Sequence, residues 1–286
     1  MSIFVAAATA FIIQSAAAQC SSSCDIVLDG RVPEGTTPSD FDSYSTSPFN
    51  AEYVKGEDLQ WSEIVELPDV PPSIFDEGCA IPVEVTISDE SIFNPSGDPQ
   101  NGFRRAGLQI QGDDPEDPSS EGIKTFHWSV MIDPQRPLNY SHEYLLAWHE
   151  TASYDANEFQ FQTGSLIGRE SQYPADTWKM IDRNNQVMWS TDIVEGEWQN
   201  FALTVDWDGN RLSTYYSLGD APLELVSDSV YNNNAGDGQF QVGILKKPTG
   251  TSDVVNSGFQ ESGIDEGLIY GGIFVEDSAS GCVTTE

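Results

Sequence analysis

The feature that most constrains this chain is a two-residue alternation of apolar and polar side chains in many short segments. In residues 141–150, for example, Tyr144, Leu146 and Trp148 share one face, while the other carries Glu143, Leu145, Ala147 and His149. Such a period is typical of β-strands with one face in a core, and no stretch sustains the longer period of a helix. The sequence therefore predicts an all-β chain of two packed antiparallel sheets, a sandwich or jelly roll.

Similar segments recur along the chain, separated by loops rich in Gly, Pro, Asn and Asp. Strands are expected at 24–30, 82–87, 103–111, 124–132, 141–150, 159–162, 201–207, 211–217, 239–247 and 268–276. Residues 168–186 are expected to form a loop. Asp208-Gly209 predicts a hairpin turn, although Asp206, Asp208 and Asn210 also faintly resemble a calcium loop.

The charge of the chain excludes several classes of partner. Forty-six acidic residues face 12 Lys and Arg, which gives a formal net charge of −34. A surface of this sign repels nucleic acid and anionic membranes, so neither is an expected partner. Neutral or cationic ligands are favoured instead, and the protein is expected to be a monomer.

The N-terminal residues 1–18 are apolar and end in small side chains, which predicts a cleaved secretory signal rather than a membrane anchor. The remaining residues, 19–286, are expected to form one secreted domain. Its four cysteines then indicate disulfides, for which three pairings exist. We favour Cys24 with Cys282 and Cys20 with Cys79, because these pairs tie both termini to the body of the domain.

The polar faces of the strands predict a groove for a polyhydroxylated ligand, because carboxylates and amides offer both hydrogen-bond donors and acceptors. The expected groove residues are Glu84, Arg105, Gln109, Gln111, His127, Glu143, His149 and Gln241, with Trp61, Tyr173, Trp178 and Trp189 as aromatic surfaces for sugar rings. Hydrolysis of a glycosidic bond needs two carboxylates, and Glu143 is the first candidate. Alternatively, Glu143 is a solvated residue or an ion-pair partner of Arg105, and the two histidines are ordinary hydrogen-bonding residues.

Five separated motifs resemble the catalytic domain of fungal glycoside hydrolase family 131. They are Phe103-Arg104-Arg105-Ala106, Arg136-Pro137-Leu138-Asn139, Ser141-His142-Glu143-Tyr144, Leu245-Lys246-Lys247-Pro248-Thr249-Gly250 and Ile269-Tyr270-Gly271-Gly272-Ile273-Phe274. The resemblance extends from about Cys24 to Cys282. It implies a β-jelly roll, secretion by a fungus or fungus-like organism, no cofactor, and hydrolysis of β-1,3, β-1,6 and β-1,4 glucans with inversion.

Carried onto this sequence, the resemblance makes Glu143 a cleft glutamate, with Arg105, His127, His149 and Lys247 near it. It implies a second glutamate after Arg-Arg-Ala, where this chain has Gly107. We therefore expect Glu143, Glu84 and His149 in catalysis, with Glu150 as another substitute acid. Binding is assigned to Arg105, Gln109, His127, Gln241, Lys247 and Trp178. The alternatives are a β-glucan-binding protein with little turnover and, less favoured, a polysaccharide lyase.

Overall fold

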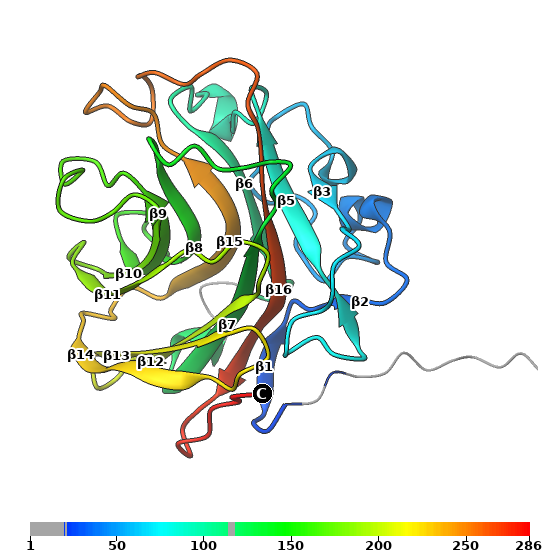
Figure 1. Ribbon diagram of the computed structural model, residues 1–286, viewed down its shortest axis with the longest axis vertical. Coiled ribbons are helices and arrows are strands. Elements are labelled where there is room, and N and C mark those ends of the chain that lie inside the picture. Colours follow the sequence, from blue (N-terminus) through cyan, green and yellow to red (C-terminus); the bar gives the residue numbers. More distant parts are fainter. Residues whose placement is uncertain (1–19, 21, 114–117) are drawn as a thin grey trace, which may run out of the picture.

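A computed structural model describes residues 20, 22–113 and 118–286, which form two antiparallel sheets packed face to face (Figure 1). The larger sheet has eight strands in the order β14-β13-β12-β7-β16-β5-β3, with β1 also paired to β16. Its strands are β1 (Ile26–Asp29), β3 (Val65–Glu66), β5 (Val83–Ser88), β7 (Ile123–Ile132), β12 (Gln199–Asp206), β13 (Arg211–Leu218), β14 (Glu224–Tyr231) and β16 (Asp265–Asp277).

The smaller sheet has six strands in the order β11-β10-β9-β8-β15-β6. They are β6 (Arg104–Gln109), β8 (Glu143–Thr151), β9 (Asn157–Gly164), β10 (Thr177–Asp182), β11 (Val187–Asp192) and β15 (Gly238–Lys246). A separate pair joins β2 (Val32–Pro33) to β4 (Ala80–Ile81). Short 3-10 turns lie at Pro38–Asp42, Trp61–Glu63, Pro95–Gly97 and Pro118–Ser120.

The main core lies between the two sheets and is rich in aromatic rings. Phe126 and Trp128 of β7 contact Phe159 and Phe161 of β9 and Phe240 of β15, with ring centroids 5.0–6.4 Å apart. Rings of this size bury much apolar area, so these contacts fix how the sheets face each other. The predicted sandwich of two antiparallel sheets is confirmed.

The expected loop at 168–186 is partly wrong, because it contains β10 in its second half. The sequence reading also missed the edge strands β11 and β14. Most side chains of β14 are exposed or half-buried, so its sequence lacks the buried face that produces a clear alternation. The hairpin predicted at Asp208-Gly209 is confirmed, since Asp206 pairs with Arg211 across β12 and β13.

A β-bulge in β8 changes which side chains face the core. Leu145 pairs with Gln162 of β9, but the next pair joins Ala147 to Phe161, so Leu146 is an extra residue. Leu146 and Ala147 both enter the main core, whereas Trp148 lies on the outer face with Leu145. A single inserted residue reverses the facing of all later side chains in the strand. The predicted faces are therefore correct before the bulge and wrong after it.

Strand β15 has its own irregularity opposite this point, at Gly243. Its φ is +143°, and a Cβ there would lie 2.2 Å from the carbonyl oxygen of Ala106. We therefore expect Gly243→Ala to lower the free energy of unfolding by about 3 kcal/mol, from backbone strain and displacement of β6.

Gly107 is a matched control, because it pairs with Gly243 across the same ladder. A Cβ there would have ordinary contacts, the nearest being Gln241 Oε1 at 3.4 Å. Gly107→Ala should change stability by less than about 1 kcal/mol in urea unfolding. Equal losses for both variants would contradict this account of Gly243.

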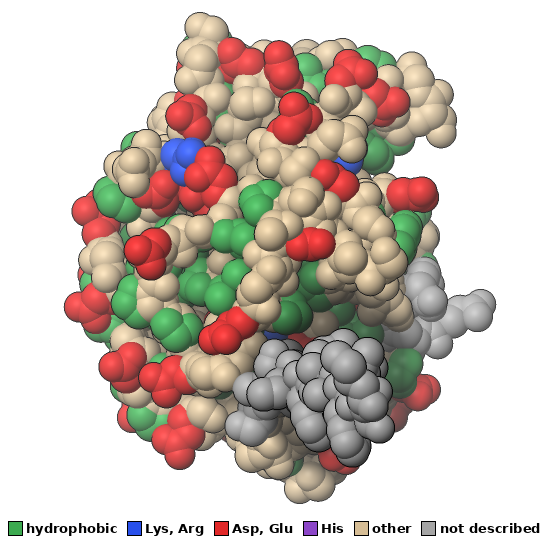
Figure 2. All heavy atoms as spheres, turned by 90° about the vertical axis from the view of Figure 1, so that its right-hand side faces the viewer, with side chains coloured by type: hydrophobic (Ala, Val, Ile, Leu, Met, Phe, Trp, Pro, Cys, Tyr) green, Lys and Arg blue, Asp and Glu red, His purple; other side chains and the backbone are tan. Residues whose placement is uncertain are grey.

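The two favoured disulfide pairings are confirmed, with Cys20 joined to Cys79 and Cys24 to Cys282. The second bridge spans 258 residues of sequence and ties the segment before β1 to the chain after β16. Figure 2 shows Asp and Glu side chains distributed over one face of the molecule, with few Lys or Arg among them. The expected signal segment lies outside the described residues. Among those described, no helix has the length and apolar character needed to cross a bilayer.

Candidate active site

The outer face of the six-stranded sheet carries two adjoining cavities. One, of about 400 Å³, is lined by Glu143 with Ser165, Ile167, Glu170 and Pro248 among others. The other, of about 670 Å³, is lined by residues of β6, β8 and β15 and by the loops above them, including Arg105, Leu145, Trp148, Glu150, Lys247 and Tyr53. We refer to the two cavities together as the groove.

Glu143 lies where these cavities meet, at the first position of β8. Its Oε1 accepts a hydrogen bond from Lys247 Nζ at 2.5 Å, and its Oε2 accepts one from the backbone N–H of Ile167 at 2.7 Å. Only 8% of the Glu143 side chain is exposed. Lys247 lines the larger cavity, so this ion pair joins the two halves of the groove.

A second lysine lies below the groove near Glu143. Lys179 of β10 is fully buried, and its Nζ donates to the carbonyl oxygens of Gly164 and Thr177 at 3.3 and 3.0 Å. Burial lowers the pKa of Lys179 to about 8, although the charges of Asp176 and Glu143 oppose this shift. Lys179 and Glu143 thus interact through their charges, whereas Lys247 is the charged donor that orients the Glu143 carboxylate and restricts its motion, as a catalytic site requires.

Three other predicted residues share the outer face with Glu143 and Lys247. Arg105 and Gln109 lie two strands away on β6, and Gln241 lies on β15 between them and β8. The Gln109 amide is already paired, because it accepts from Asn50 Nδ2 and donates to the carbonyl of Asp113. The structure therefore brings together five of the nine residues expected in the site.

The bulge in β8 also places residues in the groove that the sequence reading assigned elsewhere. Trp148 had been assigned to the core, but it lines the larger cavity with Glu150 two residues later. Glu150 Oε2 accepts from Gln241 Nε2 at 2.9 Å. Tyr53 also lines this cavity, and its hydroxyl donates to Gln239. Gly243, a glycine inside a strand, was the available sequence signal for this irregularity.

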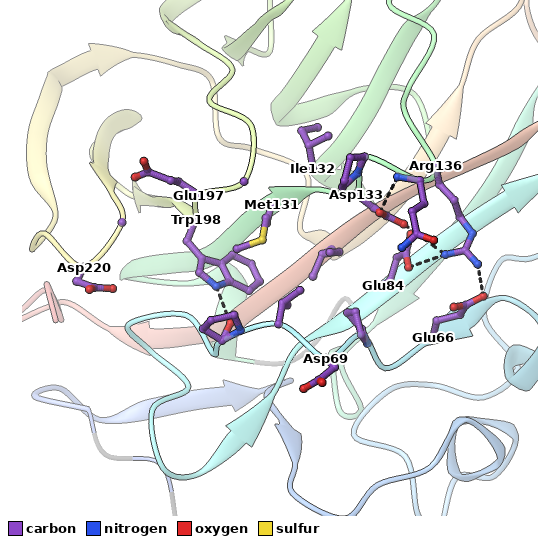
Figure 3. Close-up of a pocket in the computed structure, with 18 residues that line it drawn as sticks. Glu66, Asp69, Glu84, Met131, Ile132, Asp133, Arg136, Glu197, Trp198 and Asp220 are labelled. Carbon is purple, nitrogen blue, oxygen red and sulfur yellow. Dashed lines mark hydrogen bonds and ion pairs between the residues drawn. The ribbon is translucent and has the colours of Figure 1, made fainter.

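Glu84 does not lie in the groove, which corrects the expectation that it shares a face with Glu143. Val83, Val85 and Ile87 of β5 enter the core, so Glu84 projects from the outer face of the eight-stranded sheet, on the opposite side of the sandwich. There it lines a separate cavity of about 820 Å³ and accepts from Arg136 Nη1 at 3.0 Å. Figure 3 shows Glu84, Asp133 and Glu66 grouped around Arg136, with Trp198 at the other end of the cavity.

Glu84 should make the stability of the protein depend on pH. Burial raises its pKa from 4.5 to about 7, although the charge of Arg136 opposes the shift. Between pH 4.5 and about pH 7, the folded state therefore holds a proton that the unfolded state has already released. Its stabilising contribution is complete below pH 4.5 and is lost as the pH rises through 7.

We expect Glu84→Gln to flatten the pH dependence of the unfolding free energy between pH 4.5 and 7.5. Denaturant titrations of the wild type and the variant at several pH values measure this difference. Parallel pH profiles for the two proteins would contradict the raised pKa.

His127, His149 and Trp178 are likewise not groove residues. His127 projects from the outer face of β7, where burial lowers its pKa and its Nε2 lies 2.9 Å from Glu276 Oε1. His149 follows the bulge and packs inside against Trp207, with Nδ1 3.0 Å from Glu158 Oε2. Trp178 is a core residue whose Nε1 donates to Gln199. Trp61 is also buried in the main core, and Trp189 packs against that core. Their positions therefore do not fit the expected role of stacking on sugar rings.

None of the substitute acids named from the sequence faces Glu143 across a glycosidic bond. Glu84 is on the other side of the molecule. Glu150 lies on the same strand, and a rise of about 3.3 Å per residue places it roughly 20 Å from Glu143. Glu170 lines the Glu143 cavity, but its Oε1 accepts from the N–H of Gly168 in its own loop. The N–H of Glu170 itself and the N–H of Gly168 lower the Glu170 pKa, which favours the charged form.

The weak resemblance of residues 206–210 to a calcium loop has no structural support. Asp206 Oδ1 accepts from the N–H of Gly209 within the hairpin turn. In the described part of the chain, no group of three or more His, Cys, Asp or Glu side chains is placed to hold a metal ion.

An acidic side chain held in a partly aromatic groove on one face of a β-sandwich is typical of a carbohydrate-active protein. The chain belongs to glycoside hydrolase family 131: the model of the "Glycoside hydrolase 131 catalytic N-terminal domain" matches residues 26–281. It is thus a glycoside hydrolase, which confirms the predicted enzyme class and replaces the lyase interpretation.

Two solved structures share the fold over nearly the whole chain. One is a family 131 β-glucanase catalytic domain from Podospora anserina, with a TM-score of 0.71, 21% identity, and coverage of 91% of this chain and 98% of that one. The other is the family 131 catalytic domain from Coprinopsis cinerea, with a TM-score of 0.69, 21% identity, and coverage of 92% and 97%. They confirm the β-jelly-roll fold. A search of curated proteins finds no match.

Proposed function

We propose that this protein is a secreted β-glucanase that hydrolyses β-1,3, β-1,6 and β-1,4 glucosidic bonds of cell-wall glucans with inversion. Two findings support the substrate: the family assignment, and the β-glucanase activity named for the Podospora anserina structure. The charge of −34 is also compatible with a neutral polymer. The predicted signal segment and the two disulfides support secretion, and we expect the single domain 19–286 to act as a monomer.

The observation that carries the proposal is the position of Glu143. It is a nearly buried carboxylate at the junction of two cavities, held by Lys247 and by the N–H of Ile167. A glucan chain lying along the groove would pass over Glu143 and reach Trp148, whose indole offers a surface for a sugar ring. Arg105, Gln241 and Glu150 would bind its hydroxyl groups.

In this arrangement Glu143 acts as the general base. Inversion requires a base that activates water on one side of the sugar and an acid that protonates the leaving oxygen on the other. Because two hydrogen bonds fix the direction of the Glu143 carboxylate, it is oriented to accept a further hydrogen bond from a water and to take one proton from that water as it attacks. Gly107 supplies no acid, so leaving-group protonation depends on solvent or on another groove residue, and turnover should be slow.

The absence of an acid at Gly107 favours a second candidate function, a β-glucan-binding protein with little turnover. The two functions differ in products but share the groove. The direct test is release of reducing ends from laminarin and from cellulose by the purified protein, with sedimentation of the protein on insoluble glucan measured in parallel. Slow release with a product of inverted anomeric configuration supports the hydrolase. Binding without any release supports the second function. A protein that shows no binding and no release would refute both functions.

A further inference from the structure

Arg105 is a buried cation in the groove, and no ion pair among the described residues includes it. It is 8% exposed, and the one side-chain hydrogen bond that it forms within the described ranges runs from Nη1 to Gln100 Oε1 at 3.3 Å. Its Nε has no hydrogen-bond partner, and its guanidinium lies over the ring of Phe93. Burying a charge without a counter-ion is costly, even in a chain this rich in carboxylates. The guanidinium therefore retains the capacity to pair with an anion.

Arg105 lines the larger cavity of the groove, of about 670 Å³, together with Trp148. The space next to its guanidinium is therefore the cavity itself. A cation without a counter-ion among the described residues thus lies at the wall of an open cavity, beside an aromatic ring.

The other charged groups of the groove form no ion pair with the Arg105 guanidinium. Glu150 is the carboxylate whose charge acts on Arg105, yet it forms no ion pair with it and instead accepts from Gln241 Nε2. Lys247 is already paired with Glu143. The negative charge of the wider surface is screened beyond about 8 Å at physiological salt, so local pairing decides what binds here.

We propose that the part of the larger cavity next to Arg105 is a subsite for a carboxylate, in which the Arg105 guanidinium pairs with the acid group. Trp148 provides an apolar surface for the ring of an acidic sugar. The carboxylate belongs either to a uronic acid unit of the polysaccharide or to a free small carboxylic acid. The proposal rests on the proposed function, because it adds an acidic unit to the ligands of the glucan groove.

The test is a binding titration, by ligand-observed NMR at low salt, of methyl β-glucuronide, methyl β-glucoside and sodium acetate. The affinity of the protein for these small ligands is measured without any hydrolysis. We expect the wild type to bind the glucuronide about tenfold or more tightly than the glucoside, the ratio expected from one charged hydrogen-bonded contact. Comparable binding of acetate identifies free carboxylic acids as ligands, whereas selective binding of the glucuronide identifies uronic acid units.

Arg105→Gln should abolish the preference for the glucuronide, while Arg104→Gln should keep it. Arg104 is the matched control, because it is the adjacent arginine of β6 and its Nη1 donates to the carbonyls of Asn101 and Phe103 outside the groove. Arg105→Lys keeps a positive charge at this position and should retain part of the preference, which separates loss of the charge from loss of the fold in Arg105→Gln.

Equal binding of glucuronide and glucoside by the wild type would overturn the proposal, as would a preference that survives in Arg105→Gln. Laminarin hydrolysis is measured on the same samples. Hydrolysis without carboxylate preference refutes this subsite alone, whereas carboxylate preference without glucan binding or hydrolysis refutes the proposed function alone.

Discussion

Replacing Glu143 with glutamine is expected to lower kcat on laminarin by about 10²- to 10⁴-fold, the contribution of a general base. The amide can still accept from the N–H of Ile167, so the loop above β8 should keep its position. What the amide loses is the ability to take a proton from water. Reducing-sugar release measured under saturating substrate separates this loss from weaker binding.

Glu150→Gln is the matched control, because Glu150 lies on the same strand and face but roughly 20 Å from Glu143. It should mainly raise KM, since Glu150 lines the cavity proposed to bind the glucan and bonds to Gln241. If Glu143→Gln kept the wild-type kcat, or if Glu150→Gln lost as much, Glu143 would not be the base and the proposed mechanism would be wrong.

The second large effect is expected from Gly107→Glu, which should raise kcat on laminarin by about 10²-fold or more. Gly107 pairs with Gly243, four residues from Lys247, which bonds to the backbone of Glu143. Strand spacing and rise place the Cα atoms of residues 107 and 143 roughly 16 Å apart. Glutamate side chains that converge from that distance can approach the carboxyl separation of roughly 6.5–9.5 Å used by inverting enzymes.

The Cβ of the new side chain would make ordinary contacts, with Gln241 Oε1 at 3.4 Å and Trp148 Cη2 at 3.8 Å. Gly107→Gln is the control: it fills the same space but cannot transfer a proton, so it should leave kcat at the wild-type level. An increase in both variants would show that packing, not acid catalysis, was responsible. No increase in Gly107→Glu would mean that the acid is supplied elsewhere, and Glu170→Gln would then test the other carboxylate of the Glu143 cavity.

Local alternation predicted most strands correctly, because a strand between a core and solvent records its two environments in successive residues. Thus Phe126, Trp128 and Val130 identified β7, and Val83 and Val85 identified β5. Edge strands such as β14 were missed because they lack a consistently buried face. The disulfide pairing was predicted correctly from the positions of the cysteines in the chain, because the favoured pairs tie both chain ends to the body of the domain.

The candidate site was predicted less completely, for two physical reasons. The bulge at Leu146 depends on pairing with β9 and β15, so the sequence of β8 alone assigned His149 outward and Trp148 inward. In addition, alternation separates inward from outward but does not say which sheet a strand joins. Glu84 and His127 are outward-facing as expected, yet they project from the opposite side of the sandwich.

The sequence by itself determined the two-layer β architecture and placed Glu143 on an outward face, because the two-residue period is a local property of each strand. Only the tertiary structure decided which outward residues meet. Sheet membership and register come from hydrogen bonds between segments far apart in the chain, and these bring Arg105, Gln241, Lys247 and Glu143 together while separating Glu84 from them.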